Sequence, residues 1–276
     1  MGTHTSCGSR GAVSTGSVVA NVSNWTATVK ETSHSAVTSA SKKGTVVISG
    51  TCDWEGSFST YSVSPPAVPG QKLTFTGFTG ADGTDTGGSI SGPIIITSVS
   101  TTINIGTGEP VKWDVSFQGN GKPTIGTTEV LDTAIPALVS AAGATVSLSS
   151  SASTLNVTQV TINVQCAVSG GTATSNSEGW LKRFGGPFTG TVSLAVQDSR
   201  IDAGLELGED LELEVALSNG TTMTVSYVHI TDFGGVSIDN SSPEPIQFTI
   251  NGTWNCHDGS AFGEITLGGA SVWSGT

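Results

Sequence analysis

The residues best placed to act together as a chemical group are three carboxylates, Asp210, Glu212 and Glu214, which alternate with apolar residues. Successive side chains of a β-strand point to opposite faces, so the three acids would share one face and the apolar residues the other. Such a row repels the phosphates of a nucleic acid. The same pattern is equally typical of an ordinary solvated strand face, and both interpretations stay open at this point.

The other candidates for chemistry lack partners at useful spacing. Cys256-His257 has no further ligand at the separations of a zinc site, and Asp82-Gly83-Thr84-Asp85 lacks the later acids of a calcium loop. The chain contains no G-x-S-x-G element and no phosphate-binding glycine loop. The sequence therefore predicts no enzyme activity, no metal site and no cofactor.

Charge limits the possible partners. The formal net charge is -12, and it is uneven: residues 1–135 carry nine acids and seven bases, whereas residues 136–276 carry thirteen acids and three bases. Affinity for a phosphate backbone requires Lys and Arg, so a nucleic-acid binder is not expected. No segment reaches the roughly 18 apolar residues of a membrane span. Met1–Val13 lacks the apolar stretch of a secretory signal, which predicts synthesis and assembly in a cytoplasm.

The chain repeats itself at long range. Glu109–Val115 matches Glu244–Ile250, and Asn21–Thr26 matches Asn156–Thr161, both at an offset of 135. A period of this length corresponds to a whole domain. The predicted organisation is an N-terminal arm (1–20), a first copy (21–130), a linker (131–154), a second copy (155–258) and a C-terminal arm (259–276).

Hydrophobic alternation with period two predicts the elements of each copy. Residues 155–168 indicate one strand with a bulge between Val157 and Val160, and Asn219-Gly220 indicates a tight hairpin. Helical periodicity is almost absent. The predicted fold class is all-β, with two tandem homologous antiparallel β-sandwich or barrel-like domains.

Two stretches lack strand patterning at matching positions of the copies, Glu31–Gly44 and Val168–Gly186. Loops of this length within a compact domain are usually functional. We expect them to contact a neighbouring subunit, in an adjacent ring if the protein forms rings. Their candidate contact residues are His34, Lys42, Lys43, Trp180, Lys182 and Arg183.

Residues 20–125 resemble a phage major tail tube protein. The resemblance rests on the strand beginning Val22-Ser23-Asn24-Trp25, on Cys52–Phe58, on Pro69–Phe75, and on Val111–Gly121 with its aromatic strand and closing Gln-Gly-x-Gly turn. The second copy keeps the order of elements but ends on Ile250–Asn255 instead of the Phe-Gln-Gly ending.

The resemblance implies a structural virion protein of the tail, a β-sandwich whose inner sheets join between subunits around a lumen. Rings of this family normally hold six such domains, so a chain with two would close as a homotrimer with pseudo-six-fold symmetry. The implied partners are further copies of the chain, a tape-measure protein and tail terminator or tip proteins. DNA would pass through the lumen without specific binding, and the acids of residues 210–214 would face it. The alternative function is a tandem Ig-like capsid-decoration or surface-binding protein.

Overall fold

The computed structural model describes residues 11–41, 44–80, 87–127, 129–130, 138–148, 155–197, 205–237, 246–255, 264–268 and 270–274. Lys42, Lys43, Asp82–Asp85 and Cys256-His257 lie outside the described residues, as do most of the expected linker and parts of both expected arms. The described residues contain sixteen strands, one 3-10 turn at Ser39–Ser41 and no α-helix. The predicted all-β fold class is therefore confirmed.

The strands fall into two halves of the chain. The first half contains β1 (Ala12–Ser14), β2 (Val18–Val19), β3 (Val22–Ala36), β4 (Val46–Tyr61), β5 (Lys72–Phe78), β6 (Ser89–Asn104), β7 (Lys112–Gly119) and β8 (Thr124–Gly126). The second half contains β9 (Thr145–Leu148), β10 (Val157–Val168), β11 (Gly185–Gln197), β12 (Asp210–Ala216), β13 (Thr222–Ser237), β14 (Gln247–Trp254), β15 (Glu264–Leu267) and β16 (Ala270–Ser274).

The strand pairings of the first half recur in the second half. The first half pairs in the order β3-β4-β7-β6-β5-β1, with β8 also on β6. The second half pairs in the order β10-β11-β14-β13-β12-β9, with β15 also on β13. All pairs are antiparallel. The similarity between the two sequence segments thus corresponds to one topology used twice.

The boundaries of the two copies differ from those expected. Strands β1 and β2 fall within the expected N-terminal arm, and β1 pairs with β5. Strand β9 falls within the expected linker and pairs with β12, and the β15–β16 hairpin falls within the expected C-terminal arm and pairs with β13. These strands are short, and no long alternating pattern marked them in the sequence.

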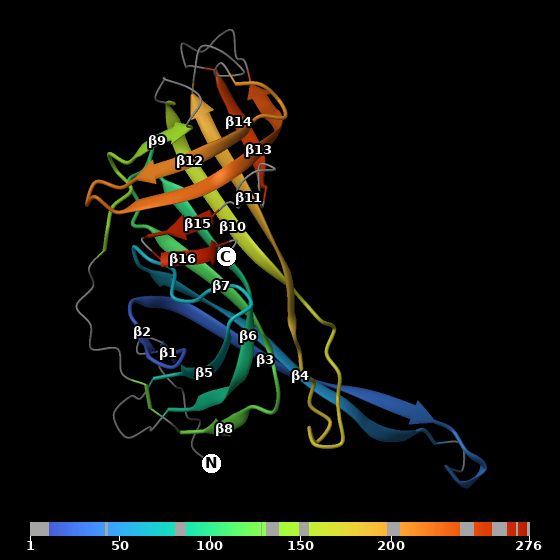
Figure 1. The fold of residues 1–276 in the computed structure, drawn as a ribbon. Helices are drawn as coiled ribbons and strands as arrows, with labels where there is room; N and C mark the ends of the chain where they lie inside the picture. The colour runs from blue at the N-terminus through green and yellow to red at the C-terminus, as the bar shows by residue number, and fades with distance from the viewer. Residues whose placement is uncertain are drawn as a thin grey trace.

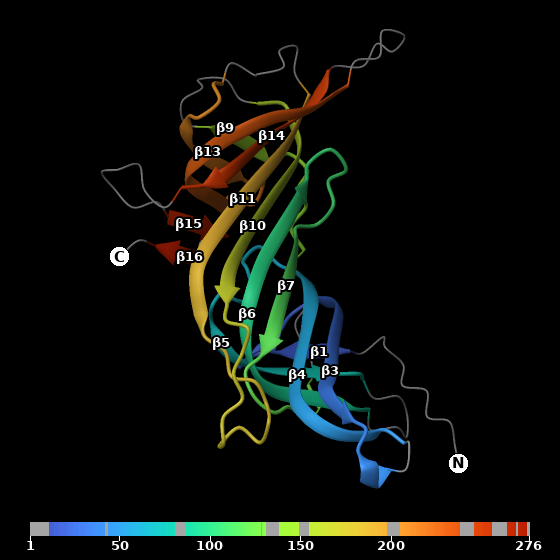
Figure 2. The ribbon, with the colours of Figure 1, turned by 90° about the vertical axis from the view of Figure 1, so that its right-hand side faces the viewer.

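Each copy has two layers, because its longest inner strand bends from one layer into the other. The N-terminal half of β6 pairs with β5, and its C-terminal half pairs with β7. In the second copy, the N-terminal half of β13 pairs with β12 and its C-terminal half pairs with β14. Figure 2 shows the layer that contains β3, β4, β7, β6, β10 and β11 side by side, and Figure 1 shows β5, β12 and β9 in the layer beside it.

Apolar side chains between the layers form one contiguous core that runs through both copies. In the first copy it is aromatic: Phe75 lies 4.5 Å from Phe117 and 6.2 Å from Trp54 between ring centroids. In the second copy it is mainly aliphatic, with Leu194, Leu213 and Ile250 all almost fully buried. Burial at roughly 25 cal/mol per Å² of apolar surface makes this shared core the main stabilising term.

Strands β3 and β4 extend beyond the body as a long two-stranded arm (Figure 1). The segment Glu31–Gly44, expected to be a loop, is therefore strand as far as Ala36, paired from Ser33–Ala36 to Val46–Ser49. The expectation was wrong because the arm is exposed on both faces. A strand with two solvated faces needs no alternation of apolar and polar residues, so the sequence carried no period-two signal.

Candidate assembly surfaces

The two copies are joined by a shared sheet. Strand β10, the first strand of the large layer in the second copy, pairs antiparallel with the C-terminal half of β6 in the first copy. The register runs from Gln159 opposite Asn104 to Gln165 opposite Ser98, and Val164 lies opposite Val99. One copy therefore continues the sheet of the other without a break (Figure 2).

The strands equivalent to this junction lie at the two open ends of the large layer. The counterpart of β10 is β3, which pairs with β4 alone among the described strands. The counterpart of residues 98–102 of β6 is residues 232–237 of β13, where the described residues provide no strand on the side away from β14. Both β6 and β13 carry a bulge at the start of this segment, between Ile96 and Ser98 and between Ile230 and Asp232.

Side chains at the open ends are more exposed than their counterparts at the junction. Val164 of β10 is fully buried, whereas its counterpart Val29 of β3 is 44% exposed. A Cβ at Gly70 would lie 3.1 Å from Phe188 in the second copy, whereas a Cβ at its counterpart Gly208 would meet nothing within 4 Å. Leu207, next to Gly208, is also exposed. The open ends thus lack the neighbour that buries the junction.

The arm carries exposed apolar side chains near its tip. Val37, Val46, Val47 and Ile48 are all exposed, between 46% and 66%. His34, one of the predicted contact residues, is exposed on the same arm and pairs with Ile48. Exposed apolar residues gathered on a projecting element indicate a contact surface more strongly than scattered ones do.

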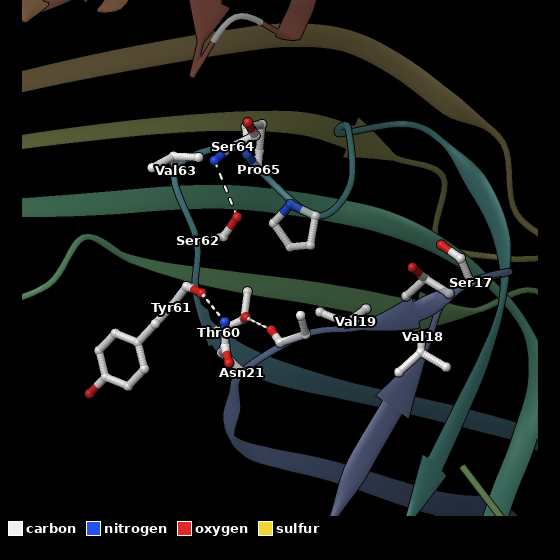
Figure 3. Close-up of a pocket in the computed structure, with 13 residues that line it drawn as sticks. Ser17, Val18, Val19, Asn21, Thr60, Tyr61, Ser62, Val63, Ser64 and Pro65 are labelled. Atoms are coloured by element: carbon white, nitrogen blue, oxygen red, sulfur yellow. Dashed lines mark hydrogen bonds between the residues drawn. The ribbon is translucent and has the colours of Figure 1, made fainter. Parts of the chain in front are cut away.

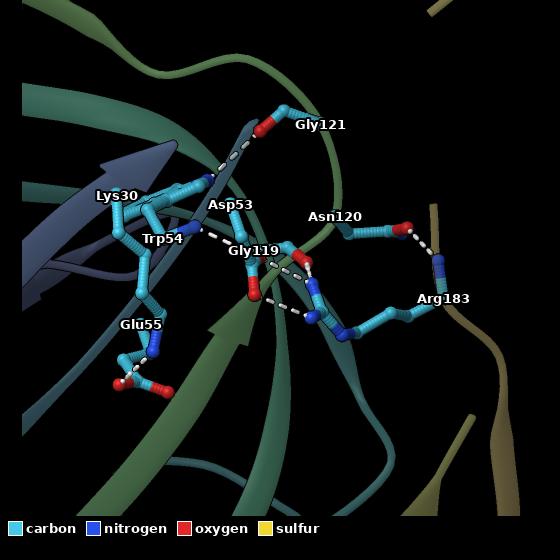
Figure 4. Close-up of polar contacts among 8 residues, drawn as sticks. All are labelled: Lys30, Asp53, Trp54, Glu55, Gly119, Asn120, Gly121 and Arg183. Atoms are coloured by element: carbon cyan, nitrogen blue, oxygen red, sulfur yellow. Dashed lines mark hydrogen bonds and ion pairs between the residues drawn. The ribbon is translucent and has the colours of Figure 1, made fainter. Parts of the chain in front are cut away.

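The corresponding segment of the second copy, residues 169–184, folds back onto the first copy (Figure 4). The guanidinium of Arg183 donates hydrogen bonds of 2.7 Å to both carboxylate oxygens of Asp53 and to the carbonyl of Gly119. The backbone N–H of Arg183 donates to Oδ1 of Asn120 at 2.8 Å. The Arg183 side chain is only 4% exposed, so it is committed to this contact.

The rest of this segment also contacts the first copy. Trp180 forms a parallel bridge with Cys52, and the Lys182 ammonium donates to the carbonyl of Asn120 at 3.0 Å. On the surface, a hydrogen bond of 2.8 Å from Lys122 lowers the pKa of Glu178, and that of Lys122 is raised in turn. Arg183 is buried in this contact, whereas Trp180 is half-buried and Lys182 is exposed, so the expected contact of this segment with a neighbouring ring stays a prediction.

The acid row of residues 210–214 has the alternation that the sequence predicted. Asp210, Glu212 and Glu214 are exposed on β12, and Leu211 and Leu213 are buried. Asp210 also lies 3.0 Å from Nδ1 of His229 on β13. The row lies on the β12 layer, the opposite layer from the one that joins the two copies.

A cavity of about 370 Å³ lies in the first copy between β2, the start of β3 and residues 60–66 (Figure 3). Its lining contains no charged side chain. Asn21 donates to the carbonyl of Tyr61 at 3.4 Å, and Ser64 donates at 2.8 Å to the carbonyl of Gly268 in the C-terminal hairpin. The cavity thus borders a second contact between the copies.

Within the described ranges, no three His, Cys, Asp or Glu side chains lie close enough together to hold a metal ion. None of the helical segments found there is long and apolar enough to cross a membrane. Comparison with protein families finds no family that matches the chain, and comparison with curated proteins finds no significant match.

Proposed function

We propose that this chain is a structural virion protein that polymerises into the tail tube of a long-tailed phage, with rings stacked into a conduit for DNA. The observation that supports this most strongly is the β6–β10 junction together with the two open ends equivalent to it. One end offers β3, the counterpart of β10, and the other offers residues 232–237, the counterpart of residues 98–102. The β3 edge of one chain can therefore pair with the β13 edge of another chain, whereas two β3 edges or two β13 edges do not match in this way.

Complementary ends of this kind produce a head-to-tail assembly. Because the two ends differ, the contact between chains is heterologous, and such contacts close into a ring or continue as a filament. If β3 of one chain pairs with β13 of the next in the register of the internal junction, every domain is related to its neighbour in the same way. Six domains, and hence three chains, then close the ring that the tail tube resemblance implies.

If the contact between chains keeps the register of the β6–β10 pairing, residues that can interact favourably come to lie opposite each other. At the internal junction Val164 lies opposite Val99, so between chains Val29 would lie opposite Phe233 of the next chain. Gln165 lies opposite Ser98 at the junction, so Lys30 would lie opposite Asp232. The first pair would bury an exposed valine, and the second would join opposite charges. Closure would also remove both open sheet edges, which are otherwise sites of uncontrolled aggregation.

The arm of β3 and β4 supplies the contact between rings in this proposal. It projects from the body, and Val37, Val47 and Ile48 are exposed near its tip. Because residues 169–184 of the second copy are bound to the first copy, each chain contributes one free arm and not two. Stacking would then follow three-fold symmetry although the ring has six similar domains.

The proposal also assigns the walls of the tube. The layer that continues through the junction forms the inner wall, as in a barrel closed by its strands. Strand β12 belongs to the other layer, so Asp210, Glu212 and Glu214 lie on the outer wall. This reverses the expectation that these acids face the lumen.

Electron microscopy of the purified full-length chain tests the proposal. We expect rings or tubes that have a central channel. Monomers or small compact oligomers without a channel, at protein concentrations up to the solubility limit, would contradict it. That outcome would favour the capsid-decoration or surface-binding alternative.

A further inference from the structure

The internal junction contains a packed side-chain contact beside the β6–β10 pairing. Ile95 of β6 is fully buried, and Cys166 of β10 is buried as well. A Cβ at Gly185 of β11 would lie 3.6 Å from Cδ1 of Ile95 and 3.3 Å from Sγ of Cys166. Ile95 of the first copy and Cys166 of the second copy therefore pack against the same glycine.

The counterpart of Ile95 in the second copy is His229. Lys72 lies opposite Ile95 in the β5–β6 pair, and Asp210 lies opposite His229 in the β12–β13 pair. The backbone hydrogen bonds around the two pairs are also the same, including one from the glycine two positions before Lys72 or Asp210. An apolar, buried position of the internal junction is thus a histidine at the open end.

The counterpart of Cys166 is Glu31 of β3. The two residues are 135 positions apart, which is the offset of the repeat, and each directly precedes a register shift with the following strand. The two strands therefore keep equivalent register up to this point. Glu31 is exposed in the free chain. In the proposed ring it would lie beside His229 of the neighbouring chain, as Cys166 lies beside Ile95.

His229 already has one acidic partner in its own chain. Its Nδ1 atom lies 3.0 Å from Oδ1 of Asp210, and its side chain is 45% exposed. Among the described residues nothing hydrogen-bonds to its Nε2 atom. Glu212 and Tyr227 are the other titratable side chains near this pair, around a cavity of about 250 Å³ that Asp210 also lines. On its β14 side His229 faces Thr253, which does not titrate.

We propose that His229 of one chain and Glu31 of the next form a proton-dependent contact that neither chain contains alone, with the imidazole between the carboxylates of Asp210 and Glu31. The proposal rests on the proposed function, because the two residues meet only in the ring. Cys52, opposite Glu31 on β4, is the other titratable group on that side of the contact.

The protonation state of the imidazole decides whether both carboxylates are satisfied. A protonated imidazole donates from both ring nitrogens, whereas a neutral one donates from a single nitrogen and leaves two acids close together. Ring closure therefore takes up a proton at each contact between chains. Because histidine changes its charge between about pH 5 and 8, closure strengthens as the pH falls through this range. The internal junction does not respond in this way, since Ile95 stands at the position of His229.

The test measures ring closure of the full-length chain by analytical ultracentrifugation at about pH 5.5 and about pH 8, with a chelator present so that no metal ion contributes. For the wild type we expect the chain concentration at half closure to be about tenfold lower at the lower pH, as for a hydrogen bond between charged groups. His229→Gln keeps a neutral hydrogen-bonding side chain and should lose most of this difference. Acid also reduces the net charge of -12 and favours association in general, so the result lies in the comparison of these two proteins.

Three further variants make the result specific. Glu31→Gln should reduce the pH dependence as His229→Gln does, whereas Glu214→Gln, at an exposed acid further along β12, should behave as wild type. His229→Ile/Glu31→Cys installs the residues of the internal junction and should close rings equally well at both pH values. If His229→Gln or this double variant keeps the pH dependence of the wild type, the inference is wrong and the proposed function stands. Absence of wild-type rings at both pH values would overturn both.

Discussion

Arg183 and Asp53 lie 130 positions apart in the chain and form a two-pronged ion pair, with both N···O distances at 2.7 Å. The pair joins the segment that precedes β11 to β4, so it links the second copy to the first. Together with the β6–β10 sheet, it fixes the two copies relative to each other. In the proposed ring, the angle between neighbouring domains would depend on this geometry.

Removal of Arg183 should strongly destabilise the chain. Arg183→Met leaves the Asp53 carboxylate, 19% exposed, without its partner, and breaking a buried pair costs about 3–5 kcal/mol. Chemical denaturation followed by tryptophan fluorescence measures the loss. The double variant Asp53→Asn/Arg183→Met should recover part of it, because no unpaired charge remains. Equal stability of Arg183→Met and wild type would show that the ion pair does not hold the copies together.

An acid at the open edge of β3 should block ring closure without unfolding the chain. Val29 is 44% exposed, so Val29→Asp should change the stability of the free chain by less than about 0.5 kcal/mol. In the ring it would bury a carboxylate opposite Phe233, which should prevent closure. Native mass spectrometry measures the outcome. Val18→Asp, at a site 47% exposed on β2, which pairs with β1 and not with β3 or β13, is the matched control and should assemble normally. If Val29→Asp still forms rings, the open edge of β3 does not form the contact between chains.

The arm should be needed for stacking and not for closure. Val47→Ser/Ile48→Ser removes two apolar side chains that are 64% and 58% exposed near the arm tip. We expect isolated rings in place of tubes, because the lost apolar contact between rings is worth roughly 1 kcal/mol or more per residue and is repeated at every arm. Negative-stain microscopy distinguishes rings from tubes. Val18→Ser is the control, and long tubes from the double variant would exclude the arm as the stacking element.

Gly119 should tolerate no side chain. A Cβ there would lie 2.1 Å from Cδ1 of Trp54, whose ring is fully buried and donates at 2.8 Å to the carbonyl of Gly121. Overpacking of this kind costs about 1–3 kcal/mol, so Gly119→Ala should lower the thermal midpoint by several degrees. Gly126→Ala is the control, since a Cβ at Gly126 meets only Ser89 Oγ at 3.9 Å. A thermal midpoint for Gly119→Ala equal to that of wild type would mean that Trp54 packs differently.

Local patterns in the sequence predicted the strands that have one buried and one exposed face. The bulge expected between Val157 and Val160 is present as a register shift between Val157 and Gln159. The turn expected at Asn219-Gly220 connects β12 to β13, with Gly220 at a φ of 85°. In both cases the determinant lies within a few residues, so the sequence is sufficient.

Features that depend on distant partners could not be predicted from local patterns. The residues next to Arg183 and Asp53 in the sequence do not indicate an ion pair, and only folding brings the two side chains together. The open edges could not be recognised either, because an edge is defined by the strand that is missing beside it. The repeat offset of 135 relates Val29 to Val164, but the pairing of β10 with β6 was needed to show why Val164 is buried.

A helical reconstruction of assembled tubes at near-atomic resolution would show directly how the chains join. We expect three chains per ring with first and second copies alternating, and β3 of each chain hydrogen-bonded to residues 232–237 of the next, with Val29 opposite Phe233. A ring of six chains, or a ring in which β3 and residues 232–237 stay unpaired between chains, would contradict the proposed assembly.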